Sequence, residues 1–78
     1  MEDIKPGMYQ HYRGNVYEVI GIALHSETME ELVIYKAMYD SDKFGNNALW
    51  ARPKIEFFEK VKKDGTEVPR FKYIGRKI

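Results

Sequence analysis

The chain has 78 residues, of which 44% are hydrophobic, 32% charged and 14% aromatic, with a net charge of +1; this composition argues against disorder and fits one small domain. Cysteine is absent, and no apolar run approaches the ~18–20 residues that cross a bilayer, which excludes disulfides, thiolate metal sites and transmembrane helices. We therefore expect residues 1–78 to form a single soluble cytoplasmic domain with no membrane association and no cofactor.

The first part of the chain is predicted to form a β-hairpin. Lys5-Pro6-Gly7 is a turn signal, and the bulky residues Met8–Arg13 predict a short strand. Gly14-Asn15 is a second turn before Val16–Leu24, which has the strongest strand pattern in the sequence and in which Gly21 indicates a bend or bulge. If side chains simply alternate along this strand, one of its faces carries Val16, Ile20, Ile22 and Leu24.

The segment that follows is compatible with a helix or a strand. Thr28-Met29-Glu30-Glu31 matches a helix capping box, and Tyr35 and Tyr39 would share one helical face with Leu32. The run Leu32-Val33-Ile34-Tyr35, however, is β-branched and aromatic, as strands prefer. We predict a strand over residues 31–39, preceded by a turn over residues 26–30.

The middle of the chain contains a loop, a strand and a short helical segment. Residues 40–47 are polar, contain glycine and have no periodicity, so they predict a loop. Ala48–Arg52 predicts a short strand that ends at Pro53. Pro53–Phe58 predicts one or two helical turns, because proline is well suited to the first helical position.

The last part of the chain is predicted to form a second hairpin and a final strand. Asp64-Gly65 is the strongest hairpin signal in the sequence, since a tight primed turn needs two positive φ angles. Pro69–Ile74 begins at a proline and is therefore predicted to lie at a sheet edge. Five to six short strands with one short helical turn indicate an all-β fold, and specifically a small closed or nearly closed barrel.

Several short fragments together resemble one family of small bacterial domains, the domain of unknown function 1653. These fragments are Lys5-Pro6-Gly7, His11-Tyr12-Arg13-Gly14, Tyr17-Glu18-Val19, His25-Ser26-Glu27-Thr28, Leu49-Trp50, Arg52-Pro53 and Pro69-Arg70-Phe71. The resemblance covers about residues 5–74 and implies a β-rich domain with an SH3-like barrel. It implies no activity and no functional residues, and the loop over residues 40–48 is longer than the family leads us to expect.

The most polar cluster in the sequence is His25, Ser26, Glu27 and Thr28, directly after the apolar strand. A catalytic triad within it is disfavoured, because neighbouring strand residues point to opposite faces. A metal site that adds His11 to His25 and Glu27 is conceivable, but two histidines without cysteine are a weak signal. A polar turn whose side chains bond its own backbone is the favoured interpretation.

Trp50, Arg52 and Arg70 are further candidates for ligand binding. Arginine suits carboxylate and phosphate recognition, whereas a single tryptophan in a small domain more often belongs to the core. Arg52 ends one predicted strand and Arg70 begins another, so both are predicted to share a barrel rim with His25.

Charge is distributed unevenly between the two parts of the chain. Residues 1–50 carry four basic and eight acidic side chains, whereas residues 51–78 carry nine basic and four acidic ones. Lys60-Val61-Lys62-Lys63 is typical of a solvated hairpin that protects an edge strand, and a nucleic-acid contact is the weaker interpretation. We favour mutual neutralisation of the two parts over a basic binding face.

Together these observations favour a non-catalytic binding module for an anionic ligand, either nucleic acid or a small molecule with a phosphate or carboxylate. The ligand-binding candidates are His11, His25, Ser26, Glu27, Thr28, Trp50, Arg52 and Arg70. Two alternatives remain open: a small hydrolase or metal-dependent enzyme centred on His25 and Glu27, and a protein-interaction domain that uses exposed aromatic residues.

Overall fold

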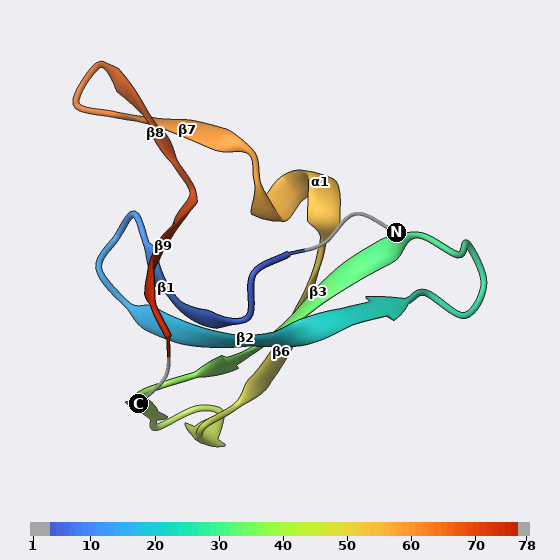
Figure 1. Cartoon of the computed structure of the whole chain (residues 1–78). Coiled ribbons are helices and arrows are strands. Elements are labelled where there is room, and N and C mark those ends of the chain that lie inside the picture. Colours follow the sequence, from blue (N-terminus) through green and yellow to red (C-terminus); the bar gives the residue numbers. More distant parts are fainter. Residues whose placement is uncertain (1–3, 77–78) are drawn as a thin grey trace.

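The computed structural model describes residues 4–76 and shows the mainly β fold that the sequence predicts (Figure 1). Five strands form one antiparallel sheet in the order β6-β3-β2-β1-β9, and two further pairs of strands form small hairpins. The strands are β1 (Gly7–His11), β2 (Val16–Leu24), β3 (Glu31–Ala37), β4 (Asp40–Ser41), β5 (Gly45–Asn46), β6 (Leu49–Pro53), β7 (Lys60–Lys63), β8 (Thr66–Pro69) and β9 (Phe71–Gly75); the helical turn is α1 (Lys54–Phe57). Within residues 4–76, the structure has no helix of the length and apolarity that crossing a membrane requires.

The sheet is strongly curled around an aromatic core. Three steps across a flat sheet, from β3 to β9, would separate two residues by roughly 14 Å. The ring centroids of Tyr35 on β3 and Phe71 on β9 are only 5.4 Å apart. Phe57 of α1 fills the concave side: its side chain is fully buried and its ring lies parallel to that of Phe71, with 4.2 Å between the centroids. The buried hydrophobic residues are Ile4, Tyr9, Val19, Val33, Tyr35, Ala37, Phe57 and Phe71.

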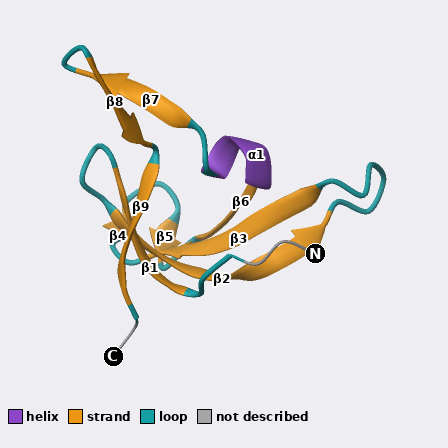
Figure 2. Ribbon diagram, turned by 45° about the horizontal axis from the view of Figure 1, so that its top comes forward, coloured by secondary structure: helices purple, strands orange, loops and turns teal. Residues whose placement is uncertain are grey.

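The closed barrel that the sequence predicted is not formed. In the part of the chain that the structure describes, β6 and β9 are the two edges of the sheet and are not paired with each other. The chain leaves β6 directly into α1, which lies over the sheet (Figure 2). Phe57 of α1 packs against Tyr35 of β3 and Phe71 of β9, so an aromatic contact joins the two sides of the open sheet. The likeness to an SH3 domain stays a prediction.

The bulge predicted at Gly21 is present and changes the faces of β2. The register between β2 and β3 shifts between Val19 and Gly21. Val19 is opposite Tyr35, and Ile22 is opposite Val33, so Val19 and Ile22 both face the core. The assignment of Ile20 and Ile22 to one face was therefore wrong: Ile20 is 52% exposed, because the bulge inverts the alternation after it.

Most of the other predicted elements are confirmed, with shifted ends. Residues 31–37 form a strand, which resolves the choice between helix and strand, and α1 follows Pro53 as predicted. β9 is an edge strand, but it begins after Pro69, which instead ends β8. The predicted loop over residues 40–47 contains the short hairpin β4–β5, whose two-residue strands are too short for a periodic pattern to show.

The turn between β7 and β8 has the backbone geometry that its sequence predicts. Asp64 has a φ of 52° and Gly65 a φ of 81°, so both turn residues are left-handed, and Lys63 pairs with Thr66 around them. This is the pattern of a two-residue primed turn, whose twist matches that of the flanking strands.

Replacing Gly65 with alanine is expected to lower the free energy of unfolding by about 1 kcal/mol, because an L side chain is strained at this φ. Gly21→Ala is the matched control, since a Cβ at either position would meet no atom within 4 Å and only Gly65 has a positive φ. Urea denaturation followed by tryptophan fluorescence measures both variants. Equal midpoints for the two would contradict the assigned turn.

Candidate functional site

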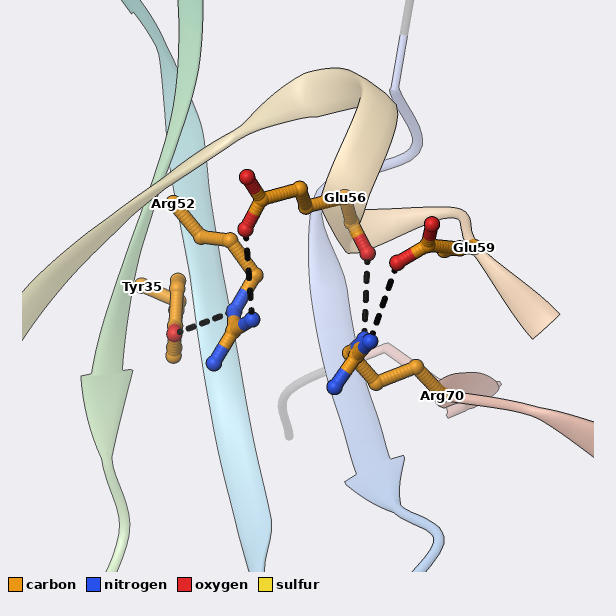
Figure 3. Close-up of polar contacts among 5 residues, drawn as sticks. All are labelled: Tyr35, Arg52, Glu56, Glu59 and Arg70. Carbon is orange, nitrogen blue, oxygen red and sulfur yellow. Dashed lines mark hydrogen bonds and ion pairs between the residues drawn. The ribbon is translucent and has the colours of Figure 1, made fainter. Parts of the chain in front are cut away.

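Arg52 and Arg70 meet at α1, where both bind groups of their own chain (Figure 3). Arg52 donates from Nε to the Tyr35 hydroxyl at 3.4 Å, and its Nη1 lies 3.7 Å from Oε1 of Glu56. Arg70 donates from Nε to the carbonyl oxygen of Glu56 at 3.2 Å, and its Nη2 lies 3.0 Å from Oε1 of Glu59. The two guanidinium groups therefore fasten the helix to β6 and to the start of β9.

The polar cluster at residues 25–28 forms a self-contained turn at the end of β2. Nδ1 of His25 accepts hydrogen bonds from the backbone N–H groups of Glu27, at 3.1 Å, and Thr28, at 3.4 Å. Oγ1 of Thr28 accepts one from the N–H of Glu30 at 3.2 Å. Ser26 and Glu27 are exposed. This is the polar turn that the sequence favours over a catalytic cluster.

The rim that His25 was predicted to share with Arg52 and Arg70 is not formed. Across the sheet, Arg52 on β6 is opposite Val33 on β3, and Val33 is opposite Ile22 on β2. Ile22 precedes His25 by three residues, so Arg52 and His25 are offset by roughly 10 Å along the strand direction. The β2–β3 turn also extends to the opposite side of the molecule from the β7–β8 hairpin in both views (Figures 1 and 2). Arg52 lies toward the same end of the sheet as His25, two strands away. Arg70, however, precedes Phe71, which is opposite His11 at the other end of the sheet, so the three side chains do not meet.

The metal site considered for His11, His25 and Glu27 is not assembled either. Among residues 4–76, no three histidine or carboxylate side chains are grouped so that they could hold a metal ion. Nδ1 of His25 is already an acceptor for its own turn, and Nδ1 of His11 accepts the N–H of Arg13 at 3.1 Å. Each histidine is therefore committed to a local backbone contact.

His11 lies at the end of β1, next to three arginines. Its ring contacts Phe71 edge-on, with 5.0 Å between the centroids. Burial lowers the pKa of His11 below its ordinary value of 6.5, and the positive charges of Arg52, Arg70 and Arg13 lower this pKa further. Since Nδ1 accepts a hydrogen bond, the neutral ring carries its proton on Nε2 and can donate it to a ligand.

A groove of about 510 Å³ opens beside His11, between the β1–β2 turn and the β7–β8 hairpin. Its walls come from β1, the β1–β2 turn, the hairpin and β9, which brings together segments far apart in the sequence. The lining residues are Gln10, His11, Tyr12, Arg13, Gly14, Lys63, Val68, Pro69 and Lys72. Three of them are permanent cations and none is acidic.

The cations of this groove have no carboxylate partner within residues 4–76. The four ion pairs of that region are Lys36–Glu18, Arg52–Glu56, Lys54–Glu31 and Arg70–Glu59. Only Lys54–Glu31 joins the acidic first part of the chain to the basic second part, so the expected mutual neutralisation is slight. Glu67 is opposite Lys62 on the hairpin and, by strand alternation, faces away from Lys63.

Trp50 was predicted to belong to the core, but it lies outside the core, at the other end of the concave side. It is 36% exposed and opposite Tyr35. Phe44 of the β4–β5 turn packs edge-on against it at 5.0 Å between centroids and is itself 55% exposed. These two rings form a small exposed aromatic pair.

Of the candidates from the sequence, only His11 lines the groove. The other polar lining residues, which the sequence did not predict as site residues, are Gln10, Tyr12, Arg13, Lys63 and Lys72. Lys63 belongs to the basic run Lys60–Lys63, which by its sequence is typical of a solvent-exposed hairpin that protects an edge strand from aggregation. Strand alternation alone predicts that Lys62 and Lys63 lie on opposite faces of β7. No sequence motif around Arg13 or Lys72 indicates that these residues line a binding site.

Comparisons with known proteins agree with the fold and add no ligand. Residues 7–73 match the family described as "Protein of unknown function (DUF1653)". The crystal structure of a DUF1653 protein from Bordetella bronchiseptica is similar, with 32% sequence identity and a TM-score of 0.87 over 100% of this chain and 96% of that one. No curated protein matches the sequence.

Arg70→Ala is expected to lower the free energy of unfolding by about 1 kcal/mol, because the Glu56 carbonyl and the Glu59 carboxylate both lose their donor. For a domain of this size this corresponds to a fall in Tm of about 4–8 °C. Lys72→Ala, which removes the same charge from β9, is the control and should leave Tm nearly unchanged. A Tm of Arg70→Ala equal to that of the control would show that the arginine is not structural.

The free energy of unfolding should decrease as the pH falls below about 6.5, the pKa of an unfolded histidine. His11 has a lowered pKa in the folded state, so in this range the unfolded chain binds the extra proton. Urea titrations between pH 7.5 and pH 5 measure the effect, and His11→Gln should have the flatter profile. Parallel profiles for the two proteins would contradict the lowered pKa.

Proposed function

Because this chain belongs to the family of proteins of unknown function DUF1653, whose description names no activity, we propose its function from its own surface: it is a non-catalytic module that binds an anionic ligand. The ligand would occupy the groove between the β1–β2 turn and the β7–β8 hairpin. The observation that carries the proposal is that Arg13, Lys63 and Lys72 border this groove with no carboxylate among its lining residues.

The groove has the size and chemistry that such a ligand requires. Its volume of about 510 Å³ falls in the range of small-molecule sites, roughly 300–1,000 Å³. Val68 and Pro69 supply apolar wall, while the guanidinium group of Arg13 and the amines of Lys63 and Lys72 supply donors for phosphate or carboxylate oxygens. Nε2 of His11 adds a neutral donor at one end.

Arg52 and Arg70 support this site from a distance. Their guanidinium groups face Glu56 and Glu59, so neither is free to turn toward a ligand without giving up contacts to α1. Burial is the main cause of the lowered pKa of His11, and the charges of Arg52 and Arg70 lower this pKa further. We therefore assign direct ligand contacts to Arg13, Lys63 and Lys72 and a positioning role to Arg52 and Arg70.

The two alternatives have weaker support. An enzyme centred on His25 and Glu27 would use an imidazole that already accepts two backbone hydrogen bonds in its own turn. A protein-interaction domain would use the exposed pair Phe44 and Trp50, which is a small apolar surface of two rings.

Titrating the ¹⁵N-labelled protein with sodium pyrophosphate and with citrate tests the proposal by NMR. The backbone amides of Arg13, Lys63 and Lys72 are expected to shift together and to saturate. Lys63→Ala and Lys72→Ala should each weaken binding about fivefold, since an exposed charge contact contributes up to about 1 kcal/mol. Lys62→Ala removes the same charge from the other face of β7 and should leave the affinity unchanged. An equal loss in Lys62→Ala, or no saturable shift with either anion, would contradict the groove as the site.

A further inference from the structure

An aromatic side chain, Tyr12, stands among the cations of the groove. The centroid of its ring lies 4.6 Å from that of His11, with an angle of 33° between the planes. The guanidinium carbon of Arg13 lies 5.5 Å from the Tyr12 centroid, and Nε of Arg13 donates to the Tyr12 hydroxyl at 3.2 Å. Rings and guanidinium planes of this kind are the surfaces on which proteins stack unpaired bases.

The backbone of Tyr12 is held in place from two sides. Its N–H donates to the carbonyl oxygen of Arg70 at 2.9 Å, which ties it to the start of β9. Its carbonyl oxygen accepts a hydrogen bond from Nζ of Lys63 at 3.2 Å, which ties it to the β7–β8 hairpin. A stacking surface fixed in this way loses little conformational freedom when a ligand binds.

The groove carries more positive charge than one small anion needs. Arg13, Lys63 and Lys72 line it, and none of the three has a carboxylate partner in the part of the chain that the structure describes. A small carboxylate or a single phosphate would use one or two of these cations. A chain of phosphates would use all three, which favours a polyanion.

The shape of the groove selects a single strand. The groove lies between the β1–β2 turn and the β7–β8 hairpin and has a volume of about 510 Å³. This volume suits one drug-sized molecule, which is comparable in size to one nucleotide. A duplex keeps its bases stacked inside and is contacted by elements that protrude into its grooves. A concave site with an aromatic wall fits a base that is already unpaired.

We propose that the anionic ligand is single-stranded nucleic acid, with one base stacked on Tyr12 and its flanking phosphates bound by Arg13, Lys63 and Lys72. This inference rests on the proposed anion-binding function and names the class of ligand for the same groove. Stacking on a ring and pairing of phosphates with cations are both independent of base identity, so the module binds with little sequence preference.

Fluorescence anisotropy with a labelled oligothymidylate of about eight nucleotides tests the inference, since single-strand sites span roughly 4–16 nucleotides. An abasic oligomer with the same phosphodiester backbone is the matched probe, and oligouridylate compares RNA with DNA. The oligothymidylate should bind about tenfold more tightly than the abasic oligomer, as expected for one stacked base. The slope of log K against log salt should be roughly −2, because each of three bound phosphates contributes about −0.7.

Variants separate stacking from charge. Tyr12→Leu keeps an apolar side chain and should reduce the affinity for oligothymidylate to that for the abasic oligomer, whereas Tyr12→Trp should restore the difference. Lys72→Ala should weaken both oligomers about equally, and Lys62→Ala should weaken neither by a comparable amount. Circular dichroism and the melting temperature of each variant establish that it is folded.

Three results would overturn the inference: equal binding of the abasic oligomer and oligothymidylate, no effect of Tyr12→Leu, or equally tight binding of a duplex of the same length. If pyrophosphate still saturates the groove in that case, the anion-binding function stands and only the class of ligand is wrong. If pyrophosphate, citrate and the oligomers all fail to shift the groove amides, both proposals fail together.

Discussion

The packing of Phe57 against Phe71 holds this small domain together, because it joins α1 to one edge of a sheet whose edges do not pair. The two rings are parallel, at an angle of 3°, and Phe57 is fully buried. Phe57 also contacts Tyr35 on β3 and Tyr9 on β1, so one side chain touches three of the five strands. In a chain of 78 residues, a buried aromatic residue of this kind contributes a large share of the stability, about 3–5 kcal/mol relative to alanine.

This packing determines which charges remain available. With α1 placed on the concave side, Glu56 comes within reach of Arg52, and Glu59 comes within reach of Arg70. The two arginines that the sequence predicted as ligand-binding residues therefore form ion pairs within the chain. The cations on the other side of Phe71, around the β1–β2 turn and the β7–β8 hairpin, have no such partners in the described part of the chain. The uneven distribution of charge along the chain therefore becomes a basic groove on one side of the molecule.

His11 connects the core to this groove. Its ring packs on Phe71, its Nδ1 orders the β1–β2 turn through Arg13, and it is one of the residues that line the groove. A neutral imidazole among several arginines adds a hydrogen-bond donor without adding further repulsion between cations. The same position makes His11 sensitive to any anion that binds beside it, because a negative charge there would oppose the effect that lowers its pKa.

The sequence by itself determined the features that depend on local backbone chemistry. The strand Val16–Leu24, its bulge at Gly21, the left-handed turn at Asp64 and Gly65 and the helical turn after Pro53 all follow from side-chain type and alternation within a few residues. Only the tertiary structure decided that the sheet stays open, because that depends on where Phe57 packs, and that His25 and Arg70 lie toward opposite ends of the sheet. It also decided the candidate site, since Arg13, Lys63 and Lys72 come from three separate segments and acquire a common role only when the sheet curls and brings them to one groove. Local patterns encode backbone angles and the face on which a side chain lies, whereas the partner that a charge meets depends on contacts between residues far apart in the chain.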